Sequence, residues 1–219
     1  MSMIEVLMVV AALMILTAIF LPTLLAPRHT TRAPRIQCVN NLKQIGLATR
    51  VWEGDNNDTY PMFVSETNGG TAEFTTGLNA WRHFQIMSNE LSTPKVLFCP
   101  AESEPGRRMA NSFVWSAGTI PLLGNSNLSF FMGMVTNELN PQMILSGDHN
   151  LTNGAPVQNG MLDLTTNRPA GWTADMHNNA GNVGLADGSV QQVNGFGLRN
   201  LVGYSGVDTN RLQMPALNP

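Results

Sequence analysis

The sequence predicts an α+β protein in which a long N-terminal α-helix packs on a head built around an antiparallel β-sheet. Three patterns support this fold class. Residues 1–26 are almost entirely apolar, residues 35–52 repeat apolar side chains at helical spacing, and Asp187-Gly188 lies between two strand-like runs. We expect three regions, with bounds 1–27 for an apolar helix, 28–54 for its amphipathic continuation and 55–219 for a β-rich head.

The apolar segment contains a single charged side chain, Glu5. A helix over 26 residues is about 39 Å long, which exceeds the ~30 Å hydrocarbon core of a bilayer. A carboxylate at the edge of such a segment costs several kcal/mol unless it has a partner. The segment is therefore a secretory signal peptide, a plain membrane anchor, or a helix that packs against copies of itself. The first is disfavoured, because no Lys or Arg precedes Arg28 and the stretch 22–27 is a poor cleavage site.

The stretch MSMIEVLMVVAALMILTAIFLP resembles the N-terminus of mature type IV pilins and type II secretion pseudopilins. Glu5 and Pro22 match positions of that family, and Met1 stands where the family usually has Phe. The resemblance implies that prepilin peptidase has removed a leader and that the pilus assembly machinery handles the subunit. It also implies that Glu5 neutralises the amine of Met1 in a neighbouring subunit.

Further motifs resemble a set of pilin-like proteins of Planctomycetes and Verrucomicrobia. They are CVNNLKQIGLA at 38–48, the Asp/Asn-rich turn at 55–58, Cys99-Pro100, and His177 followed after nine residues by Asp187-Gly188. Because these motifs occur in the same order over most of the chain, the resemblance implies the fold and the broad role of a filament subunit.

Composition limits the function classes. The formal net charge is −3 and charged residues make up 12% of the chain, about half the usual share, so nucleic-acid binding is not expected. The basic residues after the apolar segment, Arg28, Arg32 and Arg35, would by themselves place the head in the cytoplasm. A basic leader, which the resemblance implies, would reverse that orientation.

The two cysteines, Cys38 and Cys99, belong to no CxxC or haem-binding pattern. In an oxidising compartment we expect a disulfide between them, closing a loop of about 60 residues and contributing typically 2–4 kcal/mol. The alternative is a pair of buried free thiols.

Local patterns predict the remaining elements. Pro22 and Pro34 should interrupt the N-terminal helix, and the stretch 54–58 should end it. Asp187-Gly188 predicts a hairpin with a two-residue turn over 181–193. We also expect a helix at 81–91, a strand at 96–98, strands within 128–136, 143–148 and 160–164, and a loop-like tail at 200–219.

Candidate chemical sites are weak. His177 and Asp187 are interpreted either as a catalytic or metal-binding pair or, as we favour, as residues of a loop and a turn. The oxygen-rich stretches at 55–58 and 148–150, together with Asp163, are interpreted as turn chemistry and helix capping, with a calcium site as the alternative. No nucleophile motif such as GxSxG is present, so we do not predict an enzyme. No haem or zinc pattern is present either, so no cofactor is predicted, with calcium as the alternative.

The predicted function is structural. We expect identical subunits to assemble through their N-terminal helices into an extracellular, type IV pilus-like filament, after residence in the inner membrane. Met1, Glu5 and Pro22 would serve assembly. The alternatives are a pseudopilin of a type II secretion system and a membrane-anchored periplasmic binding module that never polymerises.

Overall fold

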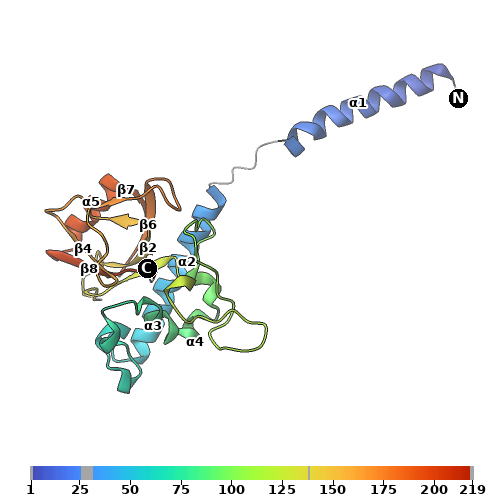
Figure 1. Ribbon diagram of the computed structural model, residues 1–219. Coiled ribbons are helices and arrows are strands. Elements are labelled where there is room, and N and C mark those ends of the chain that lie inside the picture. The colour runs from blue at the N-terminus through green and yellow to red at the C-terminus, as the bar shows by residue number, and fades with distance from the viewer. Residues whose placement is uncertain (1, 26–31, 138, 218–219) are drawn as a thin grey trace. The chain divides into compact units, whose positions relative to one another are not determined.

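The computed structural model describes residues 2–25, 32–137 and 139–217, and it describes side chains in these ranges except those of 19–25 and 32. The chain divides into two compact units, Met1–Ala33 and Pro34–Pro219, and each is considered by itself. The structure combines helices with an antiparallel sheet (Figure 1), which confirms the α+β class.

The first unit is built on helix α1, Met3–Leu25. We predicted an interruption at Pro22, which is wrong, because the helical backbone continues through this position to Leu25. Proline removes a single backbone hydrogen bond, which the helix tolerates here. Among the described residues, no helix is both long enough and apolar enough to cross a membrane.

Helix α2, Arg32–Asp55, belongs mainly to the second unit. The interruption predicted at Pro34 is also wrong, because this residue lies in the first turn of α2, where a backbone N–H has no partner within the helix. The predicted end is confirmed: Asn57 and Asp58, with φ of 57° and 52°, adopt the left-handed conformation just after it.

A six-stranded antiparallel sheet forms the centre of the head, with strand order β4-β8-β1-β2-β6-β7. A separate two-stranded ribbon pairs β3 with β5. The strand bounds are Phe130–Gly133 for β1, Ile144–Asp148 for β2, Leu151–Thr152 for β3, Met161–Thr165 for β4, Gly171–Trp172 for β5, Ala180–Leu185 for β6, Val190–Asn194 for β7 and Thr209–Gln213 for β8.

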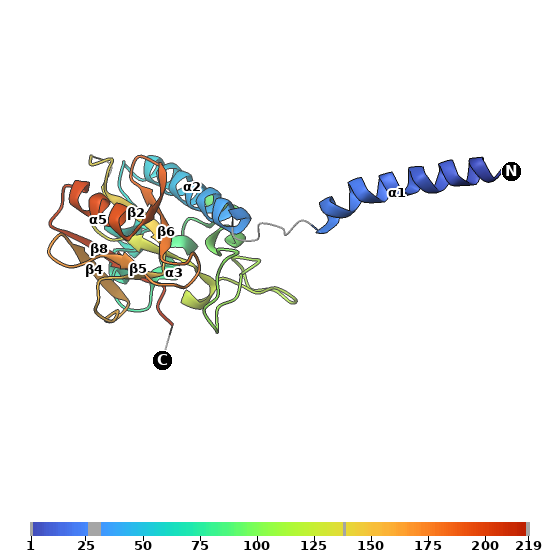
Figure 2. The ribbon, with the colours of Figure 1, turned by 90° about the horizontal axis from the view of Figure 1, so that it is seen from above.

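The sheet is covered on both faces. Phe130 and Met132 of β1 join a buried cluster with the apolar side of α2, whereas Phe131 between them joins a second cluster with Leu198 and Leu201 of helix α5, Gly195–Tyr204. This alternation follows from the two-residue period of a strand. Figure 2 shows α2 lying beside β2 and β6.

Short helices and turns fill the region before β1. The helix predicted at 81–91 is present as two pieces, and the strand predicted at 96–98 is wrong, because Pro94 begins a 3₁₀ turn there. The bounds are Ala80–Gln85 for α3, Ser88–Leu91 for α4, and Pro61–Phe63, Glu66–Asn68, Ala72–Phe74, Pro94–Leu97 and Asn125–Asn127 for the 3₁₀ helices η1 to η5.

Two further expectations need correction. The tail predicted at 200–219 as mostly loop-like instead contributes the second half of α5 and the interior strand β8. The β6–β7 hairpin is confirmed, but its turn is not the two-residue type. The Leu185 N–H donates to Ser189 O, and only Gly188 (φ 83°) of the three intervening residues has positive φ. This is a three-residue loop that closes on a left-handed glycine, so Asp187 needs no positive φ.

Candidate functional site

Helix α1 begins with a capping box formed by Ser2 and Glu5. The Ser2 Oγ accepts a hydrogen bond from the Ile4 N–H at 3.3 Å, and the Glu5 Oε2 accepts one from the Ser2 N–H at 2.8 Å. The carboxylate that the sequence left without a partner therefore has one within its own helix. The S-x-x-E pattern of a capping box was available in the sequence and was missed.

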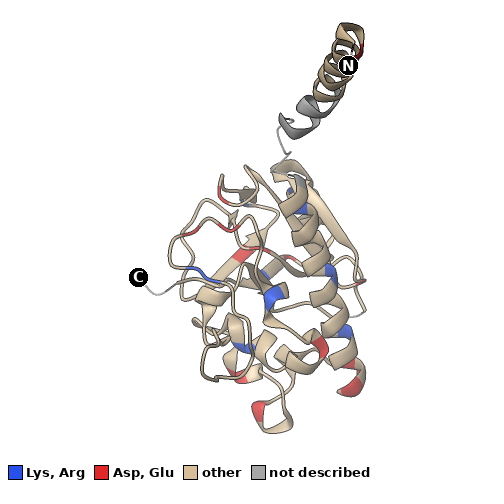
Figure 3. Cartoon of the chain, turned by 90° about the vertical axis from the view of Figure 1, so that its right-hand side faces the viewer, with Lys and Arg blue, Asp and Glu red and all other residues tan. Residues whose placement is uncertain are grey.

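The described side chains of α1 present apolar surface all around the helix. Every residue from 2 to 18 is exposed except the half-buried Ala11. Figure 3 shows the helix almost free of charge. Its exposed large apolar side chains are Met3, Ile4, Val6, Leu7, Met8, Val9, Val10, Leu13, Met14, Ile15 and Leu16. Met1 lies outside the described residues, and Pro22 is described only through its backbone.

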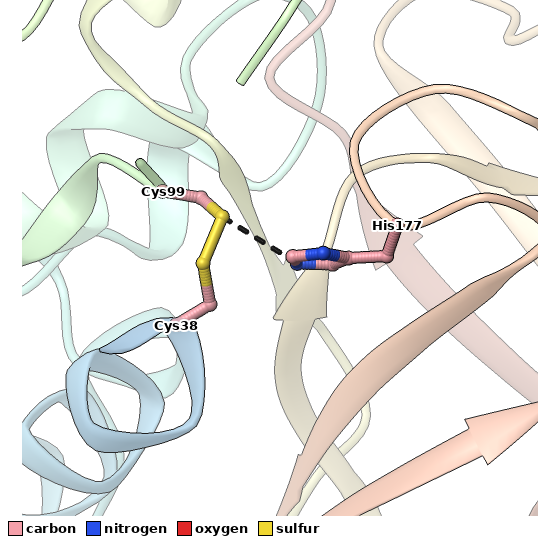
Figure 4. A group of neighbouring side chains, drawn as sticks. All are labelled: Cys38, Cys99 and His177. Atoms are coloured by element: carbon pink, nitrogen blue, oxygen red, sulfur yellow. Dashed lines mark hydrogen bonds between the residues drawn. A yellow bond between two sulfur atoms is a disulfide. The ribbon is translucent and has the colours of Figure 1, made fainter. Parts of the chain in front are cut away.

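In the head, a disulfide joins Cys38 of α2 to Cys99, which follows η4. The two Cα atoms lie 5.2 Å apart, and both residues are fully buried. His177 points at this bridge, with its Nε2 3.5 Å from the Cys99 Sγ (Figure 4). The bridge ties α2 to a segment 61 residues away in the sequence.

A buried carboxyl group lies behind His177. The His177 Nε2 is 3.4 Å from the Asp148 Oδ2, which also accepts hydrogen bonds from the backbone and side-chain nitrogens of Asn182 at 2.7 and 2.8 Å. Burial raises the pKa of Asp148 to about 7, although the Asn182 hydrogen bonds oppose this. Burial, helped by the charge of Arg35, lowers the pKa of His177 to about 4, so its ring is neutral at pH 7.

Three further contacts hold α2 against the head. The Arg35 guanidinium donates to the His177 carbonyl oxygen, and the Asn41 Nδ2 donates to the Phe98 carbonyl oxygen at 3.0 Å. Gly46 faces the hairpin turn, since a Cβ built on it would lie 3.8 Å from the Gly188 Cα. We call this set the α2 seam, comprising Arg35, Cys38, Asn41, Gly46, Phe98, Cys99, Asp148, His177, Asn182 and Gly188.

The α2 seam brings together most of the motif residues that the sequence singled out. The turn at 55–58 and Asp187 are not part of it. The Asp187 side chain is exposed, and its Oδ1 accepts a hydrogen bond from the Ser189 N–H at 2.8 Å within its own turn. His177 therefore contacts a disulfide and a buried acid, a contact that the spacing of its motif does not suggest. The geometry indicates a structural joint between α2 and the sheet.

A second polar cluster lies outside the α2 seam. The His149 Nε2 is 3.0 Å from the Glu102 Oε2, and the Arg107 Nε is 2.5 Å from the Glu104 Oε2. Burial tends to raise the pKa of Glu102, but the hydrogen bond and charge of His149, with further hydrogen bonds, lower it to about 2. Sequence reasoning noted His149 only within an oxygen-rich stretch and did not select the two glutamates.

The stretches considered for calcium serve local structure in the described chain. The Asn56 Nδ2 donates to the Trp52 carbonyl oxygen at 2.7 Å, which caps the end of α2. Asp163 on β4 pairs with Arg211 on β8, with 3.0 Å between the Oδ1 and the Nε. Calcium binding at 55–58 stays a prediction.

No protein-family model, no curated protein and no solved structure matches the chain.

Proposed function

We propose that this protein is a structural subunit that assembles with copies of itself, through α1, into a type IV pilus-like filament at the cell surface. Before assembly, the apolar segment 1–27, which extends beyond the described residues of α1, would hold the subunit in the inner membrane. The head, with a long helix on an antiparallel sheet, would be a pilin-like domain on the outside of the filament.

The observation that carries this proposal is the apolar surface of α1. Side chains such as Leu7 and Leu13 are 71% and 56% exposed, and they lie on all sides of the helix. Each such side chain gains about 1.5–3 kcal/mol when it leaves water, so the isolated helix needs a cover. Lipid tails or the helices of other copies would provide it.

The α2 seam supports a mechanical role. A filament subunit must transmit tension from its helix to its head without the two separating. The disulfide of Cys38 is a covalent link at this joint, and Arg35, Asn41 and Gly46 add contacts along about three turns of the same helix. A membrane-anchored binding module has less need of such a joint.

When α1 moves from the membrane into a filament, its lipid neighbours are replaced by the helices of other copies, and its apolar side chains stay out of water in both places. Because little hydrophobic free energy is gained, helix packing and Glu5 must guide assembly. Among the described residues, the Ser2 N–H donates to the Glu5 carboxylate, whose remaining lone pairs can accept other hydrogen bonds. Pairing with the terminal amine of a neighbour would then set the register between subunits rather than supply most of the binding energy.

Cysteine crosslinking tests self-association through α1. Leu13→Cys adds a thiol on α1, and Val114→Cys, at a position 72% exposed in the head, is the matched control. With the native disulfide retained, membranes carrying each variant are oxidised briefly, and covalent dimers are quantified before and after the lipid is diluted about tenfold. We expect a dimer yield for Leu13→Cys that is well above the control and independent of dilution.

A yield no higher than that of Val114→Cys, or one that falls with dilution, would contradict assembly through α1. Either result would favour the membrane-anchored module. A pseudopilin would behave like a filament subunit in this experiment and would be distinguished by the length of the assemblies seen in electron micrographs.

A further inference from the structure

Three potential metal ligands converge in the head beside the α2 seam, since His149 directly follows Asp148. Glu102 and Glu104 lie in the segment after Cys99, and His149 follows β2. The His149 Nε2 is 3.0 Å from the Glu102 Oε2 and 3.8 Å from the Glu104 Oε2, and the three ligand atoms lie within 4.8 Å of one another. The segments are brought together by the fold, since more than 40 residues separate them in the sequence.

The cluster is reachable from solvent. Glu104 and His149 both line a cavity of about 380 Å³, shared with the C-terminal segment, and a second cavity of about 230 Å³. Glu102 is nearly buried, with a side chain 2% exposed, whereas the side chain of Glu104 is 38% exposed. One ligand is thus fixed by its surroundings and another can rotate.

Asn150 gives a second, independent sign of a ligand. It is 3% exposed and lines the smaller cavity beside Glu104 and His149. Its amide nitrogen donates to the carbonyl oxygens of Thr173, Asp175 and Ala180, but its Oδ1 has no hydrogen-bonding partner in the described part of the chain. A buried oxygen left this way costs about 1–3 kcal/mol, and water molecules on a bound cation would satisfy it.

We propose that Glu102, Glu104 and His149 bind a divalent transition-metal ion of the Zn²⁺ class. One imidazole with two carboxylates is a donor set that suits Zn²⁺, Co²⁺ or Mn²⁺, whereas Ca²⁺ prefers oxygen alone. Ligands about 2.0–2.2 Å from a metal lie roughly 3–3.5 Å from one another. The cluster already approaches this spacing, and the cavity leaves room for water in the remaining coordination positions.

Arg107 is the obvious competitor for these carboxylates. Its Nε is 2.5 Å from the Glu104 Oε2 and 3.8 Å from the Glu102 Oε2. Its other nitrogens donate to the carbonyl oxygens of Asn125, Leu128 and Pro215, so the guanidinium is anchored independently of the glutamates. With His149 neutral, as a metal ligand must be, two carboxylates against one guanidinium leave a net negative charge. Glu104 can keep one oxygen on Arg107 while the other binds the metal.

Cobalt titration of the full chain tests the site. The metal-free protein, in detergent with its disulfide intact, is titrated with Co²⁺, and the visible absorption of the bound ion is followed. We expect saturable binding of one ion per chain. His149→Gln and Glu104→Gln should each weaken it about tenfold or more, because each removes a ligand. Asp208→Asn, at an exposed head position, should leave it unchanged.

His177→Gln is the matched histidine control, because its imidazole lies against the Cys38–Cys99 disulfide and not within the proposed site. It should leave Co²⁺ binding unchanged. Circular dichroism checks that each variant is folded, and Glu104→Gln, at a partly exposed side chain, should be well tolerated.

Three results would overturn the proposal. They are absence of saturable binding to the wild type, wild-type affinity in both His149→Gln and Glu104→Gln, and loss of binding in His177→Gln alone. Displacement of Co²⁺ by an equal concentration of Ca²⁺ would overturn the assignment to the Zn²⁺ class.

Discussion

Removing the disulfide should destabilise the head by about 4 kcal/mol. The bridge joins residues 61 apart, and the loop-closure relation for a loop of this length gives about 14 cal/mol/K, or roughly 4 kcal/mol at 25 °C. The double variant Cys38→Ala/Cys99→Ala is preferred to serines, because both positions are fully buried and a serine hydroxyl would lack a partner there. For a head of this size the loss corresponds to a melting temperature lower by about 8–16 °C.

Urea denaturation of the full chain in detergent, followed by the fluorescence of the head tryptophans, measures this loss. When the wild type is unfolded in the presence of a reductant, its free energy of unfolding should equal that of the double variant. The reductant should not change the free energy of unfolding of the double variant. A difference between oxidised wild type and double variant below about 1 kcal/mol would refute the reasoning, because α2 would then be held by its noncovalent contacts alone.

Two further predictions concern the sheet. The pKa of Asp148 is raised from 3.8 to about 7, so the folded chain keeps a proton that the unfolded chain has released between those values. The stability of wild type relative to Asp148→Asn should therefore fall as the pH rises from about 4 to 7, and a flat or rising difference in urea titrations would contradict this. Gly181→Ala should cost about 1–3 kcal/mol, because its Cβ would lie 2.2 Å from the Trp172 ring. The control is Gly203→Ala on α5, where an added Cβ would meet no neighbouring atom within 4 Å, so this change should be neutral or slightly stabilising. Equal melting temperatures for the two variants would count against the packing described.

Strong local signals allowed the sequence to predict several elements of the fold. Apolar composition marked α1, helical spacing and the turn residues at 54–58 marked α2, and Asp-Gly marked the β6–β7 hairpin. The turn type was missed because Asp187-Gly188 fits both a two-residue and a three-residue loop, and only the register of Leu185 with Ser189 distinguishes them.

Strand β8 was missed because its partners are distant in the sequence and its buried residues include polar ones. Gln213 is fully buried, which a hydrophobicity pattern would not predict. Its Oε1 lies 2.6 Å from the His83 Nε2, and its amide nitrogen donates to the carbonyl oxygens of Phe74 and Gly77. The hydrogen bonds that allow this amide to be buried come from residues far away in the sequence, so sequence patterns alone do not identify Gln213 as a buried strand residue.

The candidate sites divide in the same way. Cys38 and Cys99 could be named as a pair because they are the only two cysteines. The contact of His177 with their bridge spans 78 residues and is visible only in the fold, as is the approach of Glu102 to His149. The capping box of Ser2 and Glu5 is local and was predictable.

Electron microscopy of sheared surface material, comparing four versions of the chain, tests the central claim most directly. Glu5→Gln removes the charge but keeps an acceptor for the Ser2 N–H, so it separates the charge from helix capping. Ser2→Ala removes the cap hydroxyl but keeps the charge, and Glu66→Gln is a head control at an exposed position. We predict filaments from wild type, Ser2→Ala and Glu66→Gln, and few or none from Glu5→Gln. Absence of filaments from the wild type, or undiminished filaments from Glu5→Gln, would contradict it.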